Sequence, residues 1–259
     1  MLINIQIYVI IYKQVLKKKL FLRHNFENKK MAKKKNQQND NLQELESALT
    51  KTEQFIEDNQ RLISYIVGGI IVVVAGFLGF NKFYLQPKEK DAQSQMFMAE
   101  NYFEKDSFNL ALNGDGNYLG FIDIIDSYGI TKSANLANYY TGVCFLRLGQ
   151  FEDAIDYLND FKCDDLLLAP VSEGAKGDAY LELGESDKAL SHYKKAYSMN
   201  TNEFTTPIYL LKAANLLESQ DELENALNLY KVIKADYPNS TEGRVVDKYI
   251  ARVELNLTN

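Results

Sequence analysis

Two stretches of the chain share one residue pattern: NLANYYTGVCFLRLGQFEDAIDYLNDF (135–161) and PVSEGAKGDAYLELGESDKALSHYKKA (170–196). Their equivalent positions lie 35 residues apart, and a third unit follows 37 residues later and ends before Pro238. A single helical hairpin cannot bury its own apolar face, so repetition at this period is typical of stacked hairpins. The sequence therefore predicts three helical repeats over 135–239.

The small residues that recur in this pattern have a physical reason. Small residues let the two helices of a hairpin touch. In the three units they are Gly142, Gly177 and Ala214 on the first helix and Ala154, Ala189 and Ala226 on the second. Gly149 and Gly184 are expected to end the first helix in a left-handed conformation, and Asp221 takes this place in the third unit.

The order Gly or Ala, aromatic, Gly, aromatic, Ala, aromatic, Ala and Pro resembles the tetratricopeptide repeat, and 135–161 follows it closely. The second unit departs at Ser186, where an aromatic residue is usual, and the third at Asp221. The resemblance implies an all-α fold, namely an α-solenoid of helical hairpins that holds other proteins.

Both ends of the repeat array have weaker patterns. Segment 81–134 is expected to form a degenerate first pair, with Ala99, Tyr102, Phe108 and Ala111 at the repeat's spacing. Its second helix is interrupted at 113–117 and is expected to resume near Tyr118. Segment 240–259 is expected to form a capping helix. Its apolar face would carry Val246, Ile250, Val253 and Leu257.

The interruption Asn113-x-Asp115-x-Asn117 is similar to the start of a calcium loop. Tyr118 and Ile124 stand where such a loop needs glycine and glutamate, so a turn is the favoured reading.

Residues 62–80, LISYIVGGIIVVVAGFLGF, contain no charged side chain. As a helix they would rise about 28 Å, which is close to the hydrocarbon thickness of a bilayer. A buried core helix is the alternative, but such helices are usually shorter and less uniformly apolar. The sequence therefore predicts a single transmembrane helix ahead of the solenoid.

The charges around this segment bear on its orientation. Residues 1–61 carry 12 Lys/Arg and 7 Asp/Glu, whereas residues 81–259 carry 17 and 28. The basic tail, with Lys33, Lys34, Lys35, Lys51 and Arg61, is expected to stay in the cytoplasm. The acidic remainder argues against nucleic acid as a partner.

One face of the apolar segment carries the small residues Gly68, Ala75 and Gly79. Small residues let membrane helices approach closely, so a homodimer through this face is a further hypothesis.

The head of the chain divides into two parts. In 1–30 an apolar stretch precedes a basic cluster, the reverse of a signal peptide, and Met31 opens a polar segment. We therefore interpret 1–30 as upstream or disordered sequence and 31–61 as a cytoplasmic tail. Its apolar residues Leu42, Leu45, Leu49, Phe55 and Ile56 indicate an amphipathic helix that is too short for a coiled coil.

The inner helices of a solenoid line its concave face, which is where we expect partners to bind. The predicted protein-binding residues are Leu136, Tyr139, Val143, Leu146, Arg147, Val171, Asp178, Leu181, Ile208, Leu211 and Asn215. Only Arg147 and Asn215 would suit a clamp for a terminal carboxylate. The face therefore favours an extended or helical apolar segment.

Residues suited to catalysis are sparse. The two histidines, His24 and His192, and the two cysteines, Cys144 and Cys163, form no metal or catalytic motif, and whether the cysteines pair is open. The sequence therefore predicts no enzyme, no cofactor and no metal.

The layout resembles the ancillary Sec translocon subunits of bacterial inner membranes. This resemblance implies a single-pass protein with its N-terminus in the cytoplasm and its C-terminal domain in the periplasm. Its partners would be the translocon, secreted clients or periplasmic chaperones. Two alternatives stay open: a coordinator of envelope assembly or division, and an organellar import receptor with cytosolic repeats.

Overall fold

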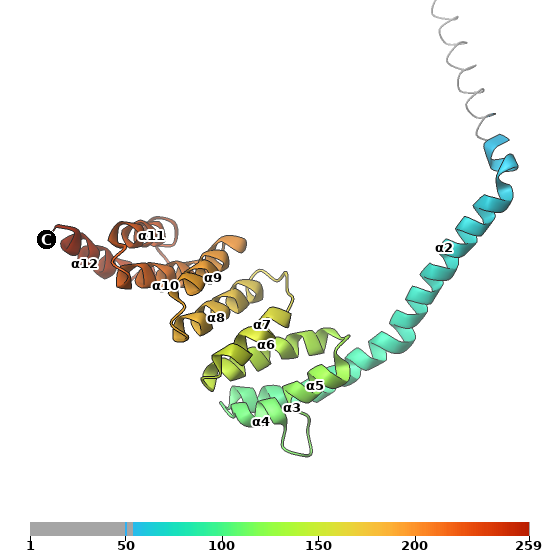
Figure 1. Cartoon of the computed structure of the whole chain (residues 1–259), viewed down its shortest axis with the longest axis horizontal. Coiled ribbons are helices and arrows are strands. Elements are labelled where there is room, and N and C mark those ends of the chain that lie inside the picture. The colour runs from blue at the N-terminus through green and yellow to red at the C-terminus, as the bar shows by residue number, and fades with distance from the viewer. Residues whose placement is uncertain (1–49, 51–53, 259) are drawn as a thin grey trace, which may run out of the picture. The chain divides into compact units, whose positions relative to one another are not determined.

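The computed structural model of the chain describes residue 50 and residues 54–258 (Figure 1). These residues contain helices and no strand, which confirms the all-α prediction. The chain divides into two units, residues 1–77 and residues 78–259, and each is described by itself. The helices are α2 (Gln60–Phe80), the π-helix η1 (Asn81–Leu85), α3 (Gln86–Glu104), α4 (Phe108–Asn113), α5 (Phe121–Tyr128), α6 (Lys132–Arg147), α7 (Phe151–Asp160), α8 (Leu168–Glu182), α9 (Ser186–Met199), α10 (Thr206–Ser219), α11 (Leu223–Asp236) and α12 (Val246–Thr258).

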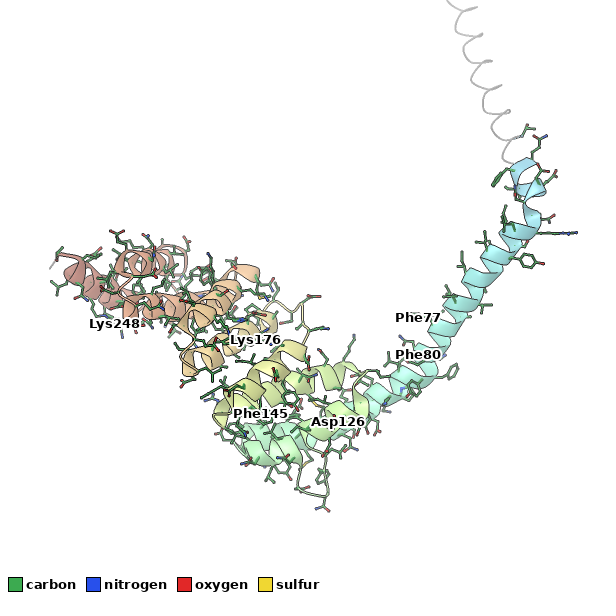
Figure 2. The ribbon with its side chains drawn as sticks, in the orientation of Figure 1. Phe77, Phe80, Asp126, Phe145, Lys176 and Lys248 are labelled. Atoms are coloured by element: carbon green, nitrogen blue, oxygen red, sulfur yellow. The ribbon has the colours of Figure 1, made fainter. Side chains whose placement is uncertain are left out.

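Helix α2 holds the predicted apolar segment, and none of its residues is buried. Phe77 and Phe80, which are labelled in Figure 2, are 65% and 52% exposed. An apolar helix with no protein cover is compatible with a single transmembrane helix, since lipid would replace the missing contacts. This helix is the one candidate span among the described residues.

The extent of this helix differs from the sequence-based expectation. The helical backbone does not end at Phe80 but continues to Glu104, and the run starts at Gln60 and not at the N-terminus of the chain. The residues that follow Phe80 contain no glycine, and no side chain caps the junction. No C-cap ends the helix there, and the backbone passes through the π-helical turn η1, which ends two residues before Pro87, and continues as α3.

Several predictions concern residues outside the described part of the chain. They are the assignments of 1–30 and Met31, the basic residues 33–35 and Lys51, and the residues Leu42, Leu45 and Leu49 of the amphipathic helix. Phe55 and Ile56 are described and are exposed.

Four equivalent turns connect the helices of the hairpins α3–α4, α6–α7, α8–α9 and α10–α11. In each turn one residue has positive φ: Asp106 (55°), Gly149 (76°), Gly184 (78°) and Asp221 (62°). The next N–H donates to a carbonyl oxygen five residues earlier, at 2.9 Å in all four turns: Ser107 to Tyr102, Gln150 to Phe145, Glu185 to Tyr180 and Glu222 to Leu217. These bonds satisfy carbonyls that the end of a helix leaves open.

The small positions of the repeat lie at the contact between paired helices, as the pattern predicts. A Cβ added to Gly142 would lie 2.6 Å from Leu158 Cγ, and one added to Gly177 would lie 2.6 Å from Tyr193 Cε1. The second helices contribute Ala111, Ala154, Ala189 and Ala226, all with no exposed surface. The hairpins lie side by side in chain order within residues 78–259 (Figure 1).

The first pair differs from the prediction at the point where its second helix resumes. Tyr118 lies in the loop, and α5 begins at Phe121. The loop is a turn built on Asp115, whose Oδ1 accepts bonds from the N–H groups of Asn117 and Tyr118 at 2.9 Å. These backbone bonds, that of Tyr118 first, lower the pKa of Asp115. Gly120 closes the loop, since a Cβ there would lie 2.1 Å from the carbonyl oxygen of Leu112.

Helix α12 packs on α11 at the end of the array. Val246, Ile250 and Val253 are buried against a cluster that includes Tyr230 and Ile233 of α11. Leu257, which the pattern places on the same face, is 42% exposed. The apolar contact of the last helix therefore stops at Val253.

Candidate protein-binding groove

A groove of about 830 Å³ lies over the first helices of the repeats. Its walls come mainly from α6, α8 and α10, because the first helices of successive hairpins face the same side of a solenoid. The lining residues are Tyr139, Val143, Leu146, Arg147, Gly149, Phe151, Val171, Ala175, Asp178, Leu181, Glu182, Tyr209 and Lys212.

A charged network that includes Asp178 and Lys212 lines part of the groove. Lys212 Nζ lies 2.6 and 2.7 Å from the two carboxylate oxygens of Asp178. The hydroxyl of Tyr193 donates to Asp178 Oδ1 at 2.7 Å, and Lys212 Nζ lies 5.8 Å from the ring centres of Tyr193 and Tyr209. Burial and the nearby Asp178 carboxylate raise the pKa of both tyrosines. The tyrosines therefore stay neutral, and Asp178 and Lys212 neutralise each other.

Two charged side chains of the groove remain available to a ligand. Arg147 ends α6 and Glu182 ends α8, and both are exposed. Neither has an ion-pair partner among the described residues. The groove therefore offers one positive and one negative group beside an apolar wall that includes Val143 and Leu181.

The structure places seven of the eleven predicted binding residues in this groove: Tyr139, Val143, Leu146, Arg147, Val171, Asp178 and Leu181. The other four lie elsewhere. Leu136 and Leu211 pack against core clusters, Asn215 lines a smaller pocket of about 320 Å³ with Asp178 and Lys212, and Ile208 lines another pocket with Phe204 and Arg244.

The sequence-based reading missed Tyr209 and Lys212. It assigned the inner face of α10 by adding 37 residues to the inner positions of the second repeat, and this selects Ile208, Leu211 and Asn215. In the groove α10 instead presents the side that adjoins α8. A Cβ on Gly174 would lie 1.9 Å from Tyr209 Cε1, so glycine at this position makes room for the tyrosine ring. A glycine opposite a tyrosine was the one signal that could have indicated the contact.

The proposed membrane-helix contact residues lie on exposed or half-buried surface of α2. Apart from the backbone of α2 itself, no atom lies within 4 Å of a Cβ built on Gly68 or Gly79. The small-residue face is therefore free of contacts within the described chain, and pairing through Gly68, Ala75 and Gly79 stays a prediction.

Both cysteines are free, and they differ in environment. Cys144 has no exposed surface, and burial raises the pKa of its thiol to about 12. Because the thiolate is the reactive form, native Cys144 should resist alkylation at pH 8, whereas the half-buried Cys163 should be labelled. Mass spectrometry of iodoacetamide-treated protein should show one adduct under native conditions and two in urea. Native labelling of Cys144 at the rate of Cys163 would contradict its burial.

These features together define a helical-repeat protein with a ligand-sized groove on the inner side of its hairpins. The family model of the tetratricopeptide repeat matches residues 122–164 and 175–241. The chain therefore contains tetratricopeptide repeats, which typically form non-catalytic scaffolds for protein–protein interaction. No curated protein matches the sequence.

Proposed function

We propose that this protein is a membrane-anchored scaffold that binds segments of client proteins during protein translocation or the biogenesis of envelope proteins. The observation that carries the proposal is the groove over α6, α8 and α10, in a chain that also has an exposed apolar helix. In this reading α2 holds the repeats at the membrane, where client segments emerge.

The groove favours one kind of client segment. The Asp178–Lys212 pair is internally neutral, and Val143, Leu146 and Leu181 offer apolar contacts. Arg147 and Glu182 add one charge of each sign. An apolar segment, extended or helical, would bury its side chains against this wall, and one charge of each sign on the segment would pair with Glu182 and Arg147.

Site-specific photocrosslinking tests this function. A photoreactive residue at Leu181, which is 39% exposed in the groove, is expected to capture translocating secretory chains in intact membranes. The same residue at Phe97 of α3, which is 65% exposed and not in the groove, is the matched control. Equal capture at both positions, or capture of no translocating chain at Leu181, would contradict the proposal.

A substitution in the groove sharpens this test. Val143→Asp places a carboxylate on the apolar wall and should reduce crosslinking from Leu181 at least fivefold, because an interface anchor contributes more than about 1 kcal/mol. Phe97→Asp, outside the groove, should leave the crosslink unchanged. The yield is read from the radioactivity of the crosslinked band.

Orientation separates this proposal from its alternatives. We propose that residues 81–259 lie in the periplasm of a bacterial inner membrane and the N-terminal tail in the cytoplasm. Protease added to spheroplasts should then digest the repeats. Protection of the repeats there would favour an import receptor with cytosolic repeats. A periplasmic domain that captures no translocating chain would favour the envelope assembly or division role.

A further inference from the structure

Residues 81–91, which follow the apolar segment, carry three lysines and two acidic residues, a net charge of +1 in an acidic domain. Lys82, Lys88 and Lys90 follow the apolar segment within ten residues, whereas residues 81–259 as a whole carry 28 Asp/Glu and 17 Lys/Arg. None of these three lysines forms an ion pair with a described residue.

The acidic residues between these lysines have other partners. Glu89 accepts hydrogen bonds at the N-terminus of α6, from Lys132 N at 2.6 Å, Ser133 N at 3.1 Å and Ser133 Oγ at 2.7 Å. Asp91 Oδ2 accepts a bond of 2.7 Å from the hydroxyl of Tyr128. A carboxylate at a helix N-terminus satisfies open N–H groups and offsets the helix dipole. Both carboxylates are therefore engaged with α5 and α6, and neither forms an ion pair with Lys82, Lys88 or Lys90.

Aromatic rings hold the lysine ammonium groups. Lys88 Nζ lies 5.7 Å from the ring centre of Tyr84 and 5.9 Å from that of Tyr128. Lys82 Nζ lies 5.9 Å from the ring centre of Phe83. Tyr84 is one helical turn closer to the apolar segment than Lys88, so the ammonium of Lys88 is directed back toward that segment.

We infer that Lys82 and Lys88, each beside its own aromatic rings, bind the phosphates of anionic phospholipids in the leaflet next to the end of the apolar helix. This inference rests on the membrane anchoring proposed above. Lys82 lies two residues past Phe80, about 3 Å along a helix and within the headgroup layer. Lys88 lies about 12 Å past Phe80, and its side chain reaches back by about one turn.

Lipid fits these residues better than an acidic protein. Amphipathic aromatic rings and lysine stems suit the boundary between hydrocarbon and headgroups, where the ring meets acyl chains and the ammonium meets phosphate. An acidic protein segment would have to approach a domain whose overall charge is negative, which costs Coulomb energy within a screening length of about 8 Å.

The test uses the full chain in nanodiscs of phosphatidylcholine and phosphatidylglycerol at a ratio of four to one. Native mass spectrometry after release into mild detergent counts the phosphatidylglycerol that stays bound. Lys82→Gln/Lys88→Gln is expected to lower its retention about 25-fold, since each lysine at a membrane surface contributes about 1 kcal/mol, or roughly fivefold. The control variant Lys162→Gln/Lys194→Gln removes the same charge from exposed positions elsewhere, and it should leave the retention of phosphatidylglycerol unchanged.

Membrane insertion is measured separately by alkaline extraction of each variant. An inserted protein with no preference for phosphatidylglycerol, or with equal loss in both double variants, overturns the lipid site and leaves the anchor in place. Failure of the unaltered chain to insert overturns both. A loss confined to Lys82→Gln/Lys88→Gln, with insertion unchanged, supports the site.

Discussion

Replacing Glu173 by leucine is expected to lower the free energy of unfolding of the repeat domain by about 3–5 kcal/mol. Glu173 is 7% exposed. Its Oε1 lies 2.8 Å from Lys176 Nζ and 2.9 Å from Lys195 Nζ, and its Oε2 lies 3.0 Å from His192 Nδ1. Lys176, labelled on α8 in Figure 2, is 8% exposed. Without Glu173 its ammonium would keep one polar contact, Asn159 Oδ1 at 3.4 Å.

Two control variants separate the buried charge from other effects. The double variant Glu173→Leu/Lys176→Leu removes both charges and should recover most of the loss, since a buried pair exchanged for apolar residues is often close to neutral. Glu185→Gln breaks an exposed pair with Lys188 and should cost less than about 1 kcal/mol. Urea unfolding of the full chain in detergent, followed by circular dichroism, measures all three. A cost under 1 kcal/mol for Glu173→Leu would contradict this account.

The same network determines a dependence on pH. Burial alone would raise the pKa of Glu173, but the hydrogen bonds from His192, Lys176 and Lys195 outweigh it and hold the pKa well below 4.5. Below about pH 4.5 the unfolded chain binds a proton at this position before the native chain does. Stability from this group is thus complete at neutral pH and is lost on acidification. The loss should be smaller in Glu173→Leu/Lys176→Leu.

Replacing Tyr230 by alanine should cost about 3–5 kcal/mol and release the last helix from the array. Tyr230 has no exposed surface and stacks on Tyr249 of α12, with ring centres 5.4 Å apart. Its hydroxyl donates to Glu218 Oε2 at 2.8 Å, and Glu218 in turn holds Arg252 of α12 at 2.6 and 2.7 Å. One side chain therefore supports both the apolar and the polar contacts of α12.

Hydrogen exchange resolves this effect by element. In Tyr230→Ala the amides of α12 should lose protection by a larger factor than those of α8, because partial unfolding begins where contacts are fewest. Tyr230→Phe keeps the ring and should cost about 1–2 kcal/mol. Tyr118→Ala, at a 49% exposed loop position, should stay within about 0.5 kcal/mol. Uniform loss of protection across all repeats in Tyr230→Ala would argue against local release.

The hairpins and their turns could be predicted from the sequence because they depend on short-range features. Gly149, Gly184 and Asp221 each stand at the same distance before the small and aromatic residues of the second helix. All three have positive φ. The fourth turn, at Asp106 with φ 55°, was not recognised as equivalent. Aspartate has a weaker preference for this conformation than glycine, and the offset from the next repeat is 43 residues instead of 35 or 37.

The groove could be predicted only in part. The inner positions of α6 and α8 could be assigned from the repeat offset, because residues on one face of a helix recur with the helix's own periodicity. The offset failed on α10, where Tyr209 and Lys212 enter the groove. Which side of a helix borders a shared groove depends on how neighbouring hairpins pack, and that packing responds to contacts such as Gly174 with Tyr209.

By itself the sequence determined the all-helical class, the repeat period, the apolar segment and the left-handed turns, because each follows from residues within a few helical turns of one another. The tertiary structure alone decided which charges are compensated. Glu89 meets the start of α6 more than forty residues away, and Lys88 lies between two rings from different helices. Coulomb and ring contacts act over a few ångströms in space, whatever the separation along the chain.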